Sequence, residues 1–139
     1  MRFKVWDAQK GKWFKEINDA QNGRIEQMVL FQKGFLVLRL NDKMILCEQT
    51  WPGRFHRVMG TTIPDMRGKE IFLGDILRIR GMKSLCRVIL LRGMFCVSPL
   101  GTEDAFPLSE HSKMAKIIGN QYQLPKLLNT KTNLNGTSN

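Results

Sequence analysis

Short apolar runs separated by Gly, Asn, Asp and Pro recur along the whole chain, whereas apolar residues at helical spacing are scarce. Runs of this kind, bounded by turn-forming residues, are typical of β-strands. The first two, Arg2–Trp6 and Lys12–Lys15, flank a short polar loop that contains Gly11, which predicts a hairpin. The pattern therefore predicts a mainly β fold, β-rich α+β at most.

Three further runs predict an antiparallel meander: Ile25–Phe31, Phe35–Leu40 and Met44–Cys47. In the middle run both alternating sets of positions are largely apolar, so we expect both faces of this strand to be covered. The cover is either a second lobe or another copy of the chain, which makes self-association one of the two expectations.

Alternation of apolar and basic residues is clearest in Asp75–Arg80. Leu77 and Ile79 fall on one face of a strand, and Arg78 and Arg80 fall on the other. This segment is therefore predicted to be a half-buried strand with a basic outer side.

A second hairpin is predicted from Cys86–Leu91 and Met94–Ser98, which surround the two-residue turn Arg92-Gly93. In this register Leu91 faces Met94, and Cys86 lies opposite Pro99. The hairpin therefore brings no two cysteines together across its strands.

One helical turn is expected near the C-terminal end, over Phe106–His111. Ser109 is its predicted cap, because a serine hydroxyl can accept a backbone hydrogen bond at a helix start. An apolar strand, Ala115–Ile118, is predicted to follow.

Trp51-Pro52-Gly53 interrupts the strand pattern and marks the predicted boundary between two lobes. Residues 1–50 are expected to form an N-terminal β-rich lobe, residues 51–70 a connector and turn, and residues 71–128 a C-terminal lobe. The polar tail, residues 129–139, has almost nothing to bury and is predicted to be disordered.

Charge is the unusual feature of the composition. The 139 residues include 22 Lys and Arg against 12 Asp and Glu, a formal net charge of +10. The excess is central, because residues 51–92 hold nine basic residues and three acidic ones. A charge of this sign attracts polyanions such as nucleic acid or acidic proteins.

The compartment follows from what the sequence lacks. No apolar run approaches the roughly 18–20 residues of a membrane helix, and the N-terminus has no signal-peptide pattern. Three cysteines without a C-x-x-C pair fit free thiols in a reducing compartment. We therefore expect a cytoplasmic protein with no membrane partner.

No nucleotide-binding loop, dinucleotide fingerprint or zinc-ligand spacing is present, so the sequence predicts no cofactor, no metal site and no enzyme activity. One acidic alternative is open: Asp65, Glu70 and Asp75 could gather as carboxylates do in two-metal nucleases. The favoured interpretation is that Asp65 and Asp75 accept backbone N–H groups in turns that Gly68 and Gly74 complete.

Aromatic and basic side chains alternate over residues 51–57, a combination in which rings stack on nucleobases and guanidinium groups hold phosphates. The simpler alternative is a connector anchored by its aromatic residues. A second basic segment follows the predicted strand that ends at Arg80. The predicted nucleic-acid-binding residues are Trp51, Arg54, Phe55, Arg57, Arg78, Arg80 and Lys83.

Three segments agree in order and spacing with a known family. The chain opens on Arg2–Asp7, a basic and apolar strand that ends in Trp-Asp. Asp65–Ile76 combines Asp-Met-Arg-Gly-Lys-Glu-Ile with Gly-Asp-Ile, and Ile117–Asn120 is followed by Pro125 and Leu127-Leu128. Together these segments resemble the YopX family of small phage and prophage proteins, and they bracket residues 2–128.

The resemblance implies a β-rich fold whose C-terminal part is a small barrel of the Src-homology-3-like kind, and it implies no activity. The chain departs from the family at one point. Members usually carry Thr-Gly and an aliphatic residue before the Asp, whereas this chain has Thr61-Thr62-Ile63-Pro64-Asp65.

The leading hypothesis is a non-enzymatic phage or prophage accessory protein of a bacterial host, which binds nucleic acid through a basic C-terminal lobe with little sequence specificity. The alternative is a protein-interaction module or inhibitor that docks on an acidic host protein and uses the same charge for steering. Composition does not separate the two.

Overall fold

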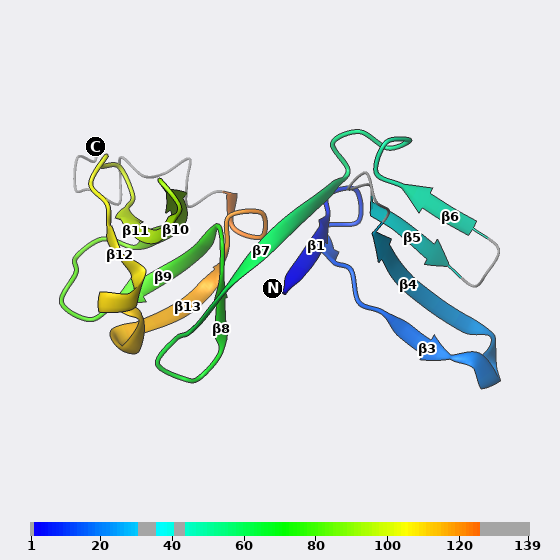
Figure 1. The fold of residues 1–139 in the computed structure, drawn as a ribbon, viewed down its shortest axis with the longest axis horizontal. Helices are drawn as coiled ribbons and strands as arrows, with labels where there is room; N and C mark the ends of the chain where they lie inside the picture. The colour runs from blue at the N-terminus through cyan, green and yellow to red at the C-terminus, as the bar shows by residue number, and fades with distance from the viewer. Residues whose placement is uncertain (1, 31–35, 41–43, 126–139) are drawn as a thin grey trace. The chain divides into compact units, whose positions relative to one another are not determined.

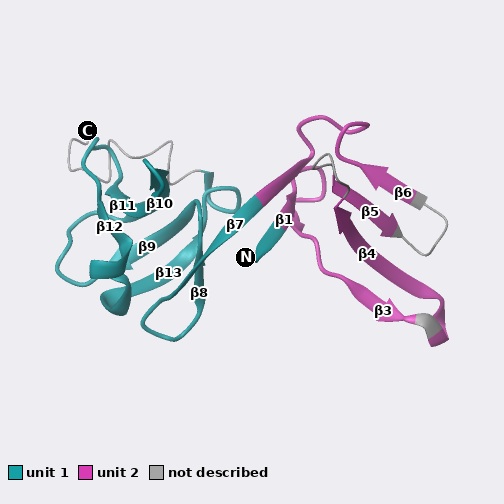
Figure 2. Cartoon of the chain, viewed as in Figure 1, with its two compact units in different colours: residues 1–4, 58–139 teal, residues 5–57 magenta. Residues whose placement is uncertain are grey.

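The computed structural model describes residues 2–30, 36–40 and 44–125, and its secondary structure is mainly β (Figure 1). The predicted fold class is therefore confirmed. The chain forms two compact units, which Figure 2 shows in different colours: unit 1 comprises residues 1–4 and 58–139, and unit 2 comprises residues 5–57. No helix in the described ranges is long and apolar enough to cross a membrane.

The predicted first hairpin is present. Strand β1 (Phe3–Asp7) pairs antiparallel with β2 (Lys12–Trp13), and Trp6 lies opposite Trp13. The two indole rings meet edge to face with their centroids 5.1 Å apart. Gly11 has a φ of 65°, so the loop needs the left-handed backbone that glycine adopts at little cost.

The predicted meander forms the antiparallel sheet of unit 2, in the order β3-β4-β5-β6. The strand β5 pairs with both of its neighbours, β4 and β6. Its first three residues, Leu36, Val37 and Leu38, are all buried. Successive residues point to opposite faces, so both faces of β5 are covered there, as predicted. The expected turns at residues 32–34 and 41–42 lie outside the described residues. The strands are β3 (Ile17–Asp19), β4 (Arg24–Leu30), β5 (Leu36–Leu40) and β6 (Met44–Cys47), with a 3-10 turn η1 (Ala20–Asn22) before β4.

The longest strand of the described residues, β7 (Phe55–Pro64), lies inside the stretch 51–70 that was expected to connect two lobes. The boundary between the compact units falls within it, after Arg57. Strand β7 belongs to a sheet of order β2-β1-β7-β8, in which β8 spans Glu70–Phe72. Its pairing with β8 shifts register between Gly60 and Pro64.

Unit 1 is built on a five-stranded antiparallel sheet of order β12-β11-β10-β9-β13 that curls into a half-barrel. The strands are β9 (Asp75–Ile79), β10 (Cys86–Leu91), β11 (Met94–Pro99), β12 (Phe106–Pro107) and β13 (Ala115–Asn120). Its core gathers buried apolar residues from these strands and from the segments around them: Ile71, Leu77, Ile79, Cys86, Val88, Val97, Leu108 and Ala115.

The predicted second hairpin has the expected register. Leu91 pairs with Met94, Ile89 with Cys96, and Cys86 with Pro99. All three cysteines of the chain are free. Burial raises the pKa of the Cys86 thiol to about 11, so this side chain behaves as a packed apolar group and not as a nucleophile.

The predicted helical turn is also present, as two consecutive 3-10 turns, η2 (Leu108–Glu110) and η3 (Ser112–Met114), before β13. The predicted role of Ser109 as cap is wrong. Pro107 occupies the cap position, no side chain caps the turn, and Ser109 lies inside it. The fully buried Leu108 anchors the turn by packing instead.

Candidate nucleic-acid interface

Arg54 is held inside unit 2 by a two-pronged ion pair with Asp7. Its Nε donates to Oδ1 of Asp7 and a terminal nitrogen donates to Oδ2, both at 3.0 Å. The side chains of Arg54 and Asp7 are only 9% and 8% exposed. The guanidinium carbon also lies 4.8 Å from the ring centre of Phe55 and 5.1 Å from that of Trp51. Arg54 therefore presents little to a phosphate.

Asp7 is tuned to remain charged in this cluster. Burial by itself raises the pKa of its carboxyl, but hydrogen bonds from Arg54, Lys10 and Gln9 together outweigh burial and lower the pKa. Phe55 is 5% exposed, so its ring has no free face for a nucleobase. The simpler alternative, aromatic anchoring, describes Arg54 and Phe55, and we leave both out of the proposed interface.

Trp51 and Arg57 are the outward members of the same segment. Trp51 is 40% exposed, and the exposed Arg57 forms an ion pair of 3.4 Å with Glu48. Both belong to unit 2, whereas Arg78, Arg80 and Lys83 belong to unit 1. The seven predicted residues therefore fall into two groups, one in each unit.

A basic surface is present on the outer side of β9. Leu77 and Ile79 are buried in the core of unit 1, while Arg78 and Arg80 are exposed, as the alternation predicted. Across the sheet, Lys116 of β13 lies directly opposite Arg78. Lys83 is exposed in the loop that follows. We call Arg78, Arg80 and Lys116 the basic strand face.

No carboxylate among the described residues forms an ion pair with any member of the basic strand face. Residues directly opposite in an antiparallel pair have Cβ atoms about 5 Å apart, and like charges there are destabilising. Arg78 and Lys116 therefore form an uncompensated cationic pair.

Lys116 was missed by the sequence analysis. A strand over Ala115–Ile118 was predicted, but its partner was not, because β9 and β13 lie about 40 residues apart in the sequence. The available signal was the alternation itself: Ala115 and Ile117 point to one face, which leaves Lys116 on the other.

Asp65 serves a turn, as the favoured interpretation predicted. Its carboxylate accepts backbone N–H groups of Arg67 (2.9 Å), Lys69 (3.0 Å) and Ile117 (3.2 Å). Gly68 completes the turn with a φ of 82°. Burial raises the pKa of Asp65, but these three hydrogen bonds, with the charge of Arg67, lower it overall.

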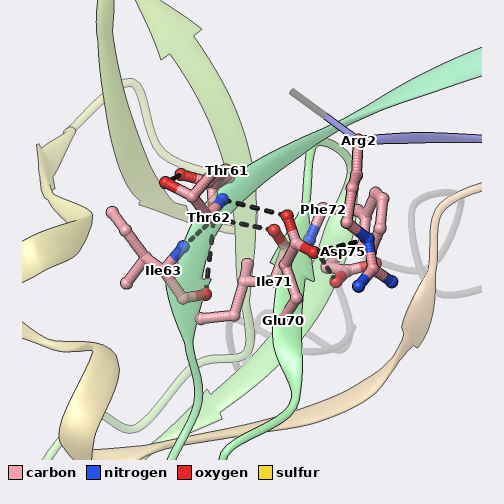
Figure 3. A network of polar contacts seen from close by, with 8 residues as sticks. All are labelled: Arg2, Thr61, Thr62, Ile63, Glu70, Ile71, Phe72 and Asp75. Carbon is pink, nitrogen blue, oxygen red and sulfur yellow. Dashed lines mark hydrogen bonds and ion pairs between the residues drawn. The ribbon is translucent and has the colours of Figure 1, made fainter.

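Asp75 serves a second turn, shown in Figure 3 with its neighbours. It accepts the N–H of Phe72 at 2.8 Å and the side-chain amide of Asn120 at 3.0 Å. Burial dominates here and raises the pKa of Asp75. Glu70 points elsewhere: it pairs with Arg2 at 3.1 Å and accepts the N–H of Thr62 at 3.0 Å.

The three carboxylates of the acidic alternative are thus engaged with different partners. Within the described ranges no three His, Cys, Asp or Glu side chains are grouped so that they could hold a metal ion. The structure therefore lends no geometry to a two-metal mechanism at Asp65, Glu70 and Asp75.

The comparison with protein families decides the relationship. The model of the YopX protein family matches residues 2–129. The chain belongs to the YopX family. No curated protein matches it.

Two solved structures of this kind share the fold. The crystal structure of YopX from Bacillus subtilis aligns with a TM-score of 0.56 and 19% identity, over 91% of this chain and 96% of that one. Protein EF1440 from Enterococcus faecalis aligns with a TM-score of 0.54 and 19% identity, over the same shares. At this identity the likeness establishes the fold alone.

The departure of this chain from the YopX pattern has a structural counterpart. Thr62, within the segment Thr61–Asp65 that departs from the pattern, has a φ of 65° in the irregular part of β7. A β-branched residue rarely adopts this conformation. Neighbouring contacts hold it (Figure 3): Thr61 Oγ1 donates to the carbonyl oxygen of Ile71 at 2.7 Å, and the N–H of Thr62 reaches Glu70. The chain therefore has a left-handed backbone at Thr62 without a glycine there.

Proposed function

We propose that this YopX-family protein is a non-enzymatic protein that binds nucleic acid, with little sequence specificity, through the basic strand face of unit 1. The observation that carries the proposal is the Arg78–Lys116 pair, two exposed or half-exposed cations placed directly opposite each other with no carboxylate partner among the described residues. A phosphate placed between them would remove their mutual repulsion.

The surroundings of the pair favour a polyanion over a single small anion. Arg80 continues the same face, and Lys83 is exposed in the loop beyond it. Each phosphate that a Lys or Arg neutralises releases condensed counterions, which gives affinity without base recognition. The net charge of +10 adds long-range attraction.

We further propose an accessory role in phage or prophage biology, a location in the cytoplasm of a bacterial host, and self-association through unit 2. The exposed apolar residues Val29, Leu30 and Ile45 of the unit 2 sheet support self-association, because a second copy of the chain would cover them.

Fluorescence anisotropy with labelled single- and double-stranded DNA and RNA tests the proposal at about 50 mM salt. We expect wild type to bind and Arg78→Glu/Lys116→Glu to bind at least about tenfold more weakly, because two phosphate contacts are lost. Lys10→Glu/Lys15→Glu is the matched control: it changes the net charge equally at two exposed lysines of unit 2. We expect the control to stay within about threefold of wild type.

Two results would overturn the proposal. If wild type binds no nucleic acid at low salt, the polyanion interface does not exist, and the acidic-protein alternative replaces it. If both double variants weaken binding equally, the overall charge acts and the basic strand face has no special role.

A further inference from the structure

The tip of the β10–β11 hairpin is apolar and exposed. Leu90, Leu91 and Met94 are 48%, 47% and 53% exposed, which places them among the most exposed large hydrophobic residues described. Leu91 and Met94 lie directly opposite each other beside the turn. A hairpin tip in water is normally polar, so this one has the composition of a contact surface.

The apolar character covers both faces of the ribbon. Leu90 and Leu91 are consecutive and therefore point to opposite sides. On one side Leu91 meets Met94, and on the other Leu90 meets Phe95, which packs partly against the core of unit 1. One core cannot bury both sides of the tip. We call this end of the hairpin, from Leu90 to Met94, the wedge.

The turn that closes this wedge carries a positive charge at a conformational cost. Arg92 and Gly93 both have positive φ, 51° and 79°, as a type I′ turn requires. Asn, Asp or Gly is favoured at the first of these positions, and Arg is not. A strained residue retained at a loop tip suggests a role for its side chain, here a guanidinium at the end of the wedge.

The dimensions of the tip fit the major groove of B-form DNA. That groove is about 12 Å wide and 8.5 Å deep and admits a two-stranded β-ribbon, whereas the minor groove is about 6 Å wide. Phe95, which lies opposite Leu90, still packs against the core, so the ribbon extends beyond the core by Leu91, Met94 and the turn between them.

Basic groups lie behind the wedge on one face of the sheet. Arg87 is four residues from Leu91, about 13 Å along the strand, and shares its face. Arg87 pairs with Ile76 of β9, and Ile76 and Arg78 point to the same face because they are two residues apart. Arg87 and Arg78 therefore lie on one face of the sheet. With the tip in the groove, Arg87 lies behind it, on the side of the phosphates that border the groove.

We propose that the β10–β11 hairpin enters the major groove of duplex DNA, with Leu91 and Met94 against thymine methyl groups and the basic residues on the flanking phosphates. The inference rests on the proposed function and deepens it by naming the nucleic acid as B-form DNA. The methyl group of thymine is the one apolar group that the bases present there. The major groove of A-form RNA is deep and narrow and excludes the ribbon.

An anionic membrane is the competing occupant of an apolar and basic tip. Binding to a membrane interface grows with the apolar area that is buried in it. Three half-exposed side chains offer too little apolar area for stable insertion into a membrane. A duplex offers phosphates to the basic strand face and to the tip at once. The observations therefore favour DNA.

The test compares two duplexes of one A·T-rich sequence, which contain either thymine or deoxyuridine, by anisotropy with the full chain. We expect wild type to bind the thymine duplex more tightly, by about fourfold for each methyl group that the tip buries. Leu91→Ala/Met94→Ala should bind both duplexes equally. Met66→Ala, which removes another exposed methionine of unit 1, is the control and should keep the preference.

The outcomes separate this inference from the proposed function. Equal binding of both duplexes by wild type, or binding of double-stranded RNA as tight as that of DNA, would refute the groove-inserted tip while leaving a polyanion interface in place. If wild type binds none of these nucleic acids, both the groove-inserted tip and the proposed function are refuted. Tip-dependent binding to vesicles of phosphatidylglycerol and phosphatidylcholine, in the absence of a thymine preference, would assign the wedge to a membrane.

Discussion

Position 62 carries a β-branched side chain where the backbone is left-handed. Glycine would adopt the φ of 65° freely, and other residues pay about 1–2 kcal/mol for it. Part of the relief from a change to glycine is offset because glycine gives the unfolded chain more freedom. We expect Thr62→Gly to raise the free energy of unfolding by roughly 1 kcal/mol in urea titrations.

Thr62→Ala is the control for this position, because it removes the hydroxyl and keeps a Cβ atom. It should gain much less than Thr62→Gly. A stability of Thr62→Gly equal to or below that of wild type would show that the positive φ does not determine the energy at this bend.

Two arginines of the same segment differ in what they do for stability. Arg54 is buried against Asp7, whereas Arg57 is exposed beside Glu48. Truncating one partner of a buried pair leaves an uncompensated charge and costs about 3–5 kcal/mol, while exposed pairs contribute about 0–1 kcal/mol. Thermal or chemical unfolding should therefore show Arg54→Ala strongly destabilised and Arg57→Ala nearly unchanged. Similar losses in both variants would contradict the structural role of Arg54.

At the scale of elements, the β10–β11 hairpin combines a costly turn residue with an apolar tip. Arg92→Asn places a residue that tolerates positive φ in the turn, so the variant should be more stable than wild type by roughly 0.5 kcal/mol. It also removes the cation at the tip, so it should bind DNA more weakly than wild type.

Arg67→Asn is the matched control for the hairpin, since it makes the same substitution at an exposed arginine of unit 1 without positive φ. It should lack the gain in stability and should bind DNA about as tightly as wild type. If Arg92→Asn binds DNA as tightly as wild type, Arg92 does not contact the nucleic acid.

Local elements could be predicted from the sequence, and pairings over long distances could not. The register of Cys86–Leu91 with Met94–Ser98 follows from a two-residue turn, and the role of Asp65 follows from Gly68 close by. The partner of Arg54 is 47 residues away, and nothing in the alternation of aromatic and basic residues around it indicates burial.

Across the whole molecule, the net charge determines attraction from a distance, whereas the fold determines which basic side chains can contact a nucleic acid. The excess of 22 basic over 12 acidic residues attracts polyanions from a distance, but only packing decides which cations remain available. Arg54 is buried in an ion pair with Asp7, whereas Arg78 and Lys116 lie on an outer face with no carboxylate partner in the part of the chain that the structure describes. Lys116, which only the folded sheet brings to Arg78, completes the interface.

The most direct test is the salt dependence of duplex DNA binding by wild type and by Arg78→Glu/Lys116→Glu. The three phosphate contacts of the basic strand face contribute about −3 to the slope of a plot of log affinity against log salt. The double variant should lose about two units of that slope. An unchanged slope in the variant, or no binding by wild type at about 50 mM salt, would contradict the account.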